Sequence, residues 1–219
     1  QMELWAPNHP REYGGMGLNL VEHGLVSEVL GRTPLGFLVF GCQAPDAGNI
    51  EILYKYGTEE QKEEYCRPNI EGKIRSCFSM TEVDLPGSNP VMMDTTAEKD
   101  GDVYVLNGTK QFITNGGEAD IYTVIALTDP KRGPRGMSAI MVEKGTPGFS
   151  FGKEENKLGI RASKTTELIF DDCKVPARNL IGEEGNGFAA IMKNFASERL
   201  QLAGQCVAIA ELALREATK

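Results

Sequence analysis

The order in which helical and strand-like patterns follow one another limits the fold of this chain more than any single motif does. Up to about residue 75, apolar residues recur at helical spacing. The period then changes to that of strands, in four runs at residues 103–106, 121–127, 138–142 and 167–170. From residue 185 onward the helical spacing returns. Because strands and helices come in blocks and do not alternate, the pattern predicts an α+β fold.

We expect three parts in this fold. An N-terminal α-helical domain covers residues 1–75, and a middle β-barrel or sandwich domain covers residues 76–184. Residues 185–219 form one amphipathic helix, and no residue after Arg215 is typical of a helix end. Such a helix needs partners to cover its apolar face, so we expect it to be the first helix of a C-terminal helical bundle that is cut short here.

Short local signals punctuate these blocks. The segment Thr58-Glu-Glu-Gln61 is a capping box and predicts the start of a helix. Asp100-Gly101 and Asn107-Gly108 are typical of tight hairpin turns. Residues 131–134 and 145–148 combine glycine and proline and are expected to be loops.

One glycine motif matches a dinucleotide-binding fingerprint by letter only. Gly185, Gly187 and Ala190 have the spacing G-x-G-x-x-A. That fingerprint requires a preceding strand inside a βαβ unit and an acidic residue about twenty positions later. Here a loop with Pro176 precedes the glycines, so we interpret them as a glycine-rich entry into a helix.

Composition excludes several classes of function. The 219 residues carry a formal net charge of −8, which disfavours a general nucleic-acid or anionic membrane surface. The longest apolar runs are far too short for a transmembrane helix. The five cysteines form no C-x-x-C pair and only two histidines are present, so we expect reduced thiols and no metal site. The chain does not begin with Met, and it is expected to be a processed or partial product.

Two segments combine a threonine with an apolar neighbour and nearby glycines. The first runs from Phe78 through Met80 and Thr81 to Gly87 and Ser88, and the second is Gln111-Phe-Ile-Thr-Asn-Gly-Gly117. Threonine hydroxyls and glycine-exposed amides can hydrogen-bond the edge of a flavin ring. Either segment alone is equally compatible with an ordinary turn in a β domain.

An ordered set of motifs along the whole chain resembles the acyl-CoA dehydrogenase family of flavoproteins. Each motif is weak by itself, and the order of the set makes the resemblance specific. The motifs are Tyr13-Gly-Gly-Met-Gly17, Tyr56-Gly-Thr-Glu-Glu-Gln-Lys62, Thr81-Glu82 with Gly87-Ser88, Leu106-Asn-Gly-Thr-Lys-Gln-Phe-Ile-Thr-Asn-Gly116, Gly145-Thr-Pro-Gly148, Lys157-Leu-Gly-Ile-Arg-Ala-Ser163, Phe170-Asp-Asp with Val175-Pro176, and Glu198-Arg-Leu200. The family fold is a helical domain, a β domain and a four-helix bundle, and the resemblance implies that both ends of this chain are truncated.

The resemblance implies FAD as cofactor and an acyl-CoA thioester as substrate. The flavin would lie between two groups of residues, Phe78, Met80 and Thr81 on one side and Phe112, Ile113 and Thr114 on the other. Gly87 and Ser88 would face its pyrophosphate, with Ser88 also near the substrate. Ser163 resembles a position near the CoA nucleotide, although a serine that caps a loop is an equal alternative.

The sequence departs from the usual family pattern at two of these positions. Many relatives have tryptophan where this chain has Phe112, so an indole N–H donor is missing while the packing of a ring is kept. The segment between Thr81 and Ser88 is one residue longer than the common pattern. The extra residue changes the spacing between Thr81 and Ser88.

The catalytic base has two candidate positions in the family. In most members it is a glutamate in a late segment that this chain does not contain. In the isovaleryl-CoA and long-chain branches it corresponds to Glu198, which helical spacing places with Phe195 and Leu202 on an apolar face. Arg199 would hold the acyl-CoA or Glu198, and Phe195 would border the substrate. The alternative is a surface glutamate paired with a nearby cation.

Three functions remain open at this point. The first is FAD-dependent α,β-dehydrogenation of an acyl-CoA, with electrons passed to an electron-transfer flavoprotein. The second is an oxygen-using acyl-CoA oxidase-like flavoenzyme, and the third is a catalytically silent fragment or paralogue. A homodimer or homotetramer is expected, in a bacterial cytoplasm or a mitochondrial matrix. Asn49 and Ile52 are candidates for the border of the acyl pocket, or simply for helix packing.

Overall fold

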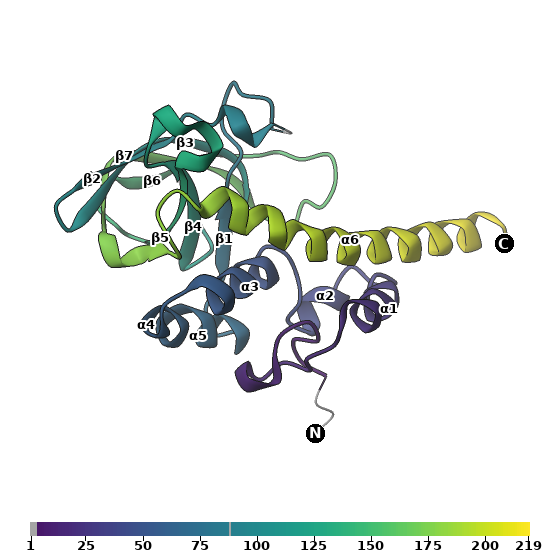
Figure 1. The fold of residues 1–219 in the computed structure, drawn as a ribbon. Coiled ribbons are helices and arrows are strands. Elements are labelled where there is room, and N and C mark those ends of the chain that lie inside the picture. Colours follow the sequence, from purple (N-terminus) through teal and green to yellow (C-terminus); the bar gives the residue numbers. More distant parts are fainter. Residues whose placement is uncertain (1–3, 88) are drawn as a thin grey trace.

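The computed structural model describes residues 4–87 and 89–219 of the chain. Figure 1 shows the helices of the N-terminal part packed beneath a β-sheet, with one long helix running from the sheet across them. The helices are α1 (Leu20–Leu30), α2 (Gly36–Val39), α3 (Asp46–Tyr56), α4 (Glu59–Gln61), the π-helical turn η2 (Lys62–Cys66), α5 (Arg67–Ile70) and α6 (Gly187–Ala217). Short 3₁₀ turns lie at Arg11–Tyr13, Pro90–Met92, Pro130–Gly136 and Ala177–Asn179. The predicted α+β architecture is confirmed.

The sheet has eight strands in an order that the sequence blocks do not reveal. They are β1 (Ser76–Ser79), β2 (Thr96–Asp100), β3 (Val103–Thr114), β4 (Ile121–Leu127), β5 (Met137–Glu143), β6 (Phe149–Glu154), β7 (Thr165–Pro176) and β8 (Leu180–Ile181). The order is β6-β7-β3-β2-β4-β5-β8, and β1 pairs in parallel with β4. In the described ranges the two edge strands, β6 and β8, do not pair with each other. Of the two predicted forms, a barrel or a sandwich, the sheet is therefore sandwich-like and not a closed barrel.

The predicted capping box is present and has a second duty. The Thr58 hydroxyl accepts a hydrogen bond from the backbone N of Gln61 at 3.2 Å, and Oε1 of Gln61 accepts one from the backbone N of Thr58 at 3.1 Å. The amide nitrogen of Gln61 also donates to the carbonyls of Arg178 and Leu180, at 2.7 and 2.9 Å. One side chain therefore both caps α4 and ties it to β8.

Of the two predicted hairpin turns, one is confirmed and one is wrong. Asp100 and Gly101 form the turn between β2 and β3, as expected. Asn107 and Gly108 instead lie inside β3, at a shift in its register with β7. Gly108 has φ +146°, and a Cβ there would lie 2.6 Å from Oγ1 of Thr95. The glycine serves close packing within a bulged strand and not a reversal of the chain.

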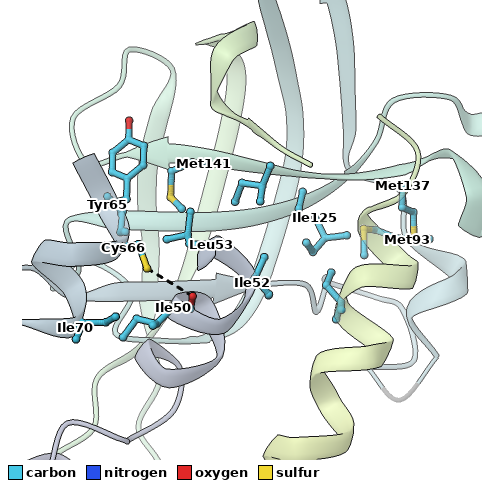
Figure 2. Close-up of a cluster of buried hydrophobic side chains, with 14 of the residues drawn as sticks. Ile50, Ile52, Leu53, Tyr65, Cys66, Ile70, Met93, Ile125, Met137 and Met141 are labelled. Carbon is cyan, nitrogen blue, oxygen red and sulfur yellow. Dashed lines mark hydrogen bonds between the residues drawn. The ribbon is translucent and has the colours of Figure 1, made fainter. Parts of the chain in front are cut away.

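An apolar core joins the helices to the sheet. Figure 2 shows Leu53 and Ile52 of α3 facing Met141 of β5 and Ile125 of β4, and Ile50 beside Ile70 of α5. Burial of each such side chain stabilises the fold by roughly 1.5–3 kcal/mol. Ile52 is thus a packing residue, and it lies in the core and not on a pocket wall.

Polar contacts fix the start of α3 against the start of β1. Oδ1 of Asp46 accepts hydrogen bonds from the backbone N and the hydroxyl of Ser76, at 2.6 and 2.7 Å. Asn49 is fully buried and donates to the Ser76 hydroxyl and to the Cys77 carbonyl, each at 2.9 Å. Asn49, like Ile52, is therefore a residue of helix packing. Its hydrogen bonds hold α3 at a fixed position relative to β1.

The long helix α6 contacts the sheet first and the other helices later. At its start the backbone of Gly187 lies so close to β5 that a Cβ would be 2.6 Å from Ala139 N. Farther along it packs on α3 and then on α1, where Gly204 approaches the carbonyl of Gly24. The glycine motif before it is a close-packed helix entry, as interpreted from the sequence. In the part of the chain that the structure describes, no helix is long and apolar enough to cross a membrane.

Candidate functional site

The ends of β1 and β3 lie next to each other and bring the two threonine segments together. The backbone N of Gln111 donates to the Thr81 carbonyl at 2.9 Å. The Cys77 thiol donates to the Thr114 carbonyl at 3.0 Å. The two segments that the sequence singled out therefore lie together where β1 and β3 end. We call this end of the strands, with Met80, Thr81, Phe112 and Thr114, the flavin-type edge.

A bulge in β3 turns Phe112 away from the core. The register of β3 against β7 shifts between Lys110 and Ile113, and Phe112 has a φ of +59°. A non-glycine residue in this left-handed region is uncommon, and bulges of this kind re-aim side chains. Phe112 is 57% exposed, whereas Ile113 is buried in the core of the sheet. Phe112 offers an aromatic face to a ligand, and Ile113 can reach one mainly through its backbone.

The donor groups at this edge suit a flavin. Thr81 and Thr114 are both partly exposed, and within residues 4–87 and 89–219 neither hydroxyl makes a side-chain hydrogen bond. Two free hydroxyls beside an exposed aromatic ring match the polar edge and the apolar face of an isoalloxazine. Gly87 is exposed in the loop after Thr81. Ser88 lies outside the described residues.

A buried ion pair underlies the same edge. Nζ of Lys110 lies 2.7 Å from Oε1 of Glu82, and neither side chain is more than 5% exposed. Burial lowers the pKa of Lys110 to about 8 against the opposing effect of Glu82. Burial would raise the pKa of Glu82, but the charge and hydrogen bond of Lys110, together with the hydrogen bonds from Thr95 and Asp94, outweigh it and the pKa is lowered. The sequence interpretation missed this pair, and a lysine inside an alternating strand was the available signal.

The helix α6 approaches this edge through an aromatic contact. The rings of Phe78 and Phe195 meet edge to face with centroids 5.8 Å apart. Glu198 follows Phe195 by three residues and hence lies about one helical turn farther along α6. Leu202, four residues after Glu198 on the same helix, is 58% exposed. The face of α6 that meets α3 is polar at this level, where it carries Asn194 along with Glu198.

Glu198 occupies a slot against a glycine of α3. Its Oε1 accepts a hydrogen bond from Nδ2 of Asn194 at 2.8 Å. A Cβ on Gly48 would overlap that oxygen and lie 3.0 Å from Cδ of Glu198. Burial, together with the negative charge of Glu51, raises the pKa of Glu198 to about 7. A desolvated carboxyl with this pKa can exchange a proton near neutral pH.

The slot opens into a cavity of about 220 Å³ between α1, α3 and α6. Most of its lining residues have a polar side chain, and several were not singled out by the sequence interpretation. Glu51 accepts a hydrogen bond from the Ser197 hydroxyl at 3.1 Å and forms an ion pair with Lys55. Burial lowers the pKa of His23, which lies at the wall of α1. The lining residues are Asn8, Leu18, Asn19, Leu20, His23, Ala47, Gly48, Glu51, Tyr54, Ser197, Glu198 and Gln201.

The remaining sequence-predicted positions lie near these features. Arg199 is exposed and stacks over the Phe195 ring, 5.6 Å from its centroid. Among the described residues it makes no ion pair with Glu198, which is hydrogen-bonded to Asn194, but its charge opposes the rise in the pKa of Glu198. Ser163 lies just before β7, whose Thr165 pairs with Thr114, so it borders the same edge of the sheet. Among residues 4–87 and 89–219, no group of three or more acidic, histidine or cysteine side chains could hold a metal ion.

Comparison with known proteins gives a consistent result. Residues 1–73 match the sequence profile of the acyl-CoA dehydrogenase N-terminal domain, and residues 77–173 match that of the acyl-CoA dehydrogenase middle domain. The chain is 45% identical over 210 residues to the acryloyl-CoA reductase (NADH) of Anaerotignum propionicum, which covers 94% of this chain and 52% of that protein. The chain spans about half the length of the curated relatives it matches.

Two solved structures share the fold across almost the whole chain. Butyryl-CoA dehydrogenase from Megasphaera elsdenii superposes with a TM-score of 0.86 at 39% identity, covering 99% of this chain and 57% of that one. A chain described with the electron transferring flavoprotein of Acidaminococcus fermentans gives a TM-score of 0.87 at 42% identity, covering 99% of this chain and 56% of that one.

Proposed function

The chain belongs to the acyl-CoA dehydrogenase family, and we propose that the protein dehydrogenates the α and β carbons of an acyl-CoA thioester with FAD as cofactor. The observation that carries this proposal is the carboxyl of Glu198. It is desolvated, its pKa is raised to about 7, and it lies one helical turn from the aromatic contact between α6 and β1. The carboxyl lies against Gly48 of α3 and borders the cavity between α1, α3 and α6. We propose that the thioester carbons of the substrate lie between this carboxyl and the flavin.

The residues at the ends of β1 and β3 fit the cofactor. Bound FAD supplies the acceptor for the β hydrogen, which leaves the substrate as hydride. The hydroxyls of Thr81 and Thr114 would hold the ring edge, and the exposed side chain of Phe112 would pack beside it. Fixed donors at a ring edge stabilise negative charge that develops there. Phe78, Met80, Gly87 and the backbone of Ile113 would complete the contacts, as would Ser88.

Glu198 would act as the general base for the α proton. Asn194 holds one of its oxygens, so the other is free to accept the proton from the substrate. A base whose pKa lies near the operating pH combines a useful deprotonated fraction with a strong driving force for transfer. Phe195 would border the acyl group, and Arg199 and Ser163 would contact the CoA portion.

The electron acceptor and the assembly state belong to the same proposal. The likeness to a chain described with an electron transferring flavoprotein supports such a protein as acceptor. The likeness to butyryl-CoA dehydrogenase supports an acyl-CoA as electron donor. We extend the proposal to a homodimer or homotetramer, as the family resemblance implies.

Anaerobic flavin bleaching tests the assignment of the base. Replacement Glu198→Gln keeps the shape and the hydrogen bond to Asn194 but removes the proton acceptor. We expect the flavin absorbance of the purified protein to bleach on addition of acyl-CoA, and Glu198→Gln to abolish this. Glu216→Gln is the matched control, because Glu216 is an exposed glutamate near the end of the same helix.

The outcomes separate the functions that the sequence left open. Full bleaching in Glu198→Gln rejects Glu198 as the base. Rapid reoxidation of the reduced flavin by oxygen, without an electron-transfer flavoprotein, favours the oxidase. A colourless protein that takes up no FAD favours the silent paralogue.

A further inference from the structure

The buried ion pair between Glu82 and Lys110 joins three segments of the chain. Nζ of Lys110 donates to Oε1 of Glu82 at 2.7 Å and to the Met80 carbonyl at 3.2 Å. The other carboxylate oxygen of Glu82 accepts from the backbone N of Asp94 at 2.6 Å, and Oε1 also accepts from the backbone N of Thr95 at 2.9 Å. One carboxylate thus connects β3, the end of β1 and the start of β2.

These bonds close the loop that follows Thr81. Glu82 stands at the beginning of this loop, and Asp94 and Thr95 stand at its end. The carboxylate therefore fastens both ends of the loop, whose described residues are 83–87 and 89–93, to the same point. The loop also packs on the flavin-type edge, since a Cβ on Gly87 would lie 3.2 Å from Cγ2 of Thr81.

A fully buried ion pair holds two segments together only against a large desolvation cost. Removing both charges from water costs several kcal/mol per ion, and apolar replacements of equal volume are often as stable. An ion pair fixes the relative position of the segments more specifically than apolar packing does, because its oxygens and ammonium protons require partners at defined places. Every partner in this case is a backbone group of Met80, Asp94 or Thr95, or the other charge.

We propose that Glu82 and Lys110 are positioning residues, which lock the Met80–Thr81 backbone and the two ends of the following loop to β3 so that FAD meets one rigid surface. The inference rests on the proposed binding of FAD. Neither side chain touches the cofactor, because both are buried beneath the edge. They act through the backbone that carries Met80, Thr81 and Gly87.

Flavin affinity and backbone exchange test the proposal together. The variants are Glu82→Gln, Lys110→Met and the double variant, in the purified protein. We expect each single variant to raise the FAD dissociation constant at least about tenfold. Amide hydrogen exchange in residues 83–95 should become faster in the absence of FAD, because the loop loses its common anchor.

Asp46→Asn is the matched control for a general loss of stability. Asp46 is another buried carboxylate, and it accepts hydrogen bonds at the opposite end of β1. We expect this variant to lower the thermal midpoint while leaving the FAD dissociation constant and the exchange of the loop close to wild type. If single variants of the pair do not fold, the double variant leaves no unpaired buried charge and takes their place.

Three results are decisive. Wild-type FAD affinity together with wild-type exchange of residues 83–95 in the variants overturns the proposal. A loss of FAD affinity no larger than that of Asp46→Asn, at an equal fall in thermal midpoint, also overturns it. Failure of the wild-type protein to take up FAD defeats the proposed function instead, and the exchange of the loop then still decides whether the pair anchors it.

Discussion

Replacement of Gly48 by alanine tests the geometry of the candidate base most directly. The slot for the Glu198 carboxyl exists because Gly48 has no side chain. A Cβ there would overlap Oε1, approach Cδ of Glu198 to 3.0 Å and approach Nδ2 of Asn194 to 3.2 Å. Carbon atoms pack at about 3.5–4.0 Å, so the carboxyl must leave the slot. We expect Glu198 to lose its hydrogen bond to Asn194 and part of its burial.

The expected effect on catalysis follows from those losses. A hydrogen bond to a charged group contributes about 1.5–3 kcal/mol. If this bond holds Glu198 in its working position, kcat/KM at high pH should fall about ten- to hundredfold in Gly48→Ala. Less burial also weakens the cause of the raised pKa of Glu198. The pH at which kcat/KM is half-maximal should therefore move down from about 7.

Steady-state kinetics over a pH range, together with thermal unfolding, is the suitable assay. Gly24→Ala in α1 is the control, because the nearest atoms to a Cβ there are those of Leu200 at 3.8 Å, an ordinary contact. In a helix interior alanine is normally about 0.5–1 kcal/mol more stable than glycine. Because the added methyl group of Gly24→Ala meets no atom closer than 3.8 Å, we expect this variant to keep the kinetics of the wild type and to be at least as stable. An unchanged pH profile and kcat/KM in Gly48→Ala would refute the reasoning.

Two further predictions concern stability. Gln61→Ala should lower the free energy of unfolding by about 2–3 kcal/mol in denaturant titrations, because the capping bond and two bonds to the carbonyls of Arg178 and Leu180 are lost; a loss under about 0.5 kcal/mol, typical of surface changes, would contradict this. The raised pKa of Glu198 means that the folded state binds a proton more tightly than the unfolded state. Its contribution to stability is then complete below pH 4.5 and is lost as the pH rises through about 7, so wild type and Glu198→Gln should differ in pH dependence across that window.

Local patterns were sufficient for the block architecture and for single turns. The helical and strand periods predicted where the helices and the sheet lie, and the capping box at Thr58 marked a real helix start. The same reasoning failed at Asn107-Gly108, where the local signal for a hairpin is indistinguishable from that for a bulge. The difference depends on Thr95, which lies just before β2 and packs against Gly108.

The site could be predicted only where the resemblance supplied its residues. Thr81 and Thr114 were predicted to act together, and their segments do meet at one edge of the sheet. Gly48 and the pair of Glu82 with Lys110 were missed. Their importance depends on which elements pack together over long sequence separations, and no periodicity of one segment contains that information.

The unbroken course of α6 has a mechanical consequence. Its start at Gly187 is pressed against the backbone of β5, whereas Glu198 faces α3, eleven residues later. At a rise of 1.5 Å per residue, the helix acts as a lever arm of about 16 Å with its fulcrum at the sheet. A tilt of about 5° would swing the carboxyl by about 1.4 Å, beyond the roughly 0.5 Å that productive geometry tolerates. Small rotations between the sheet and the helices would then move the candidate base in and out of alignment.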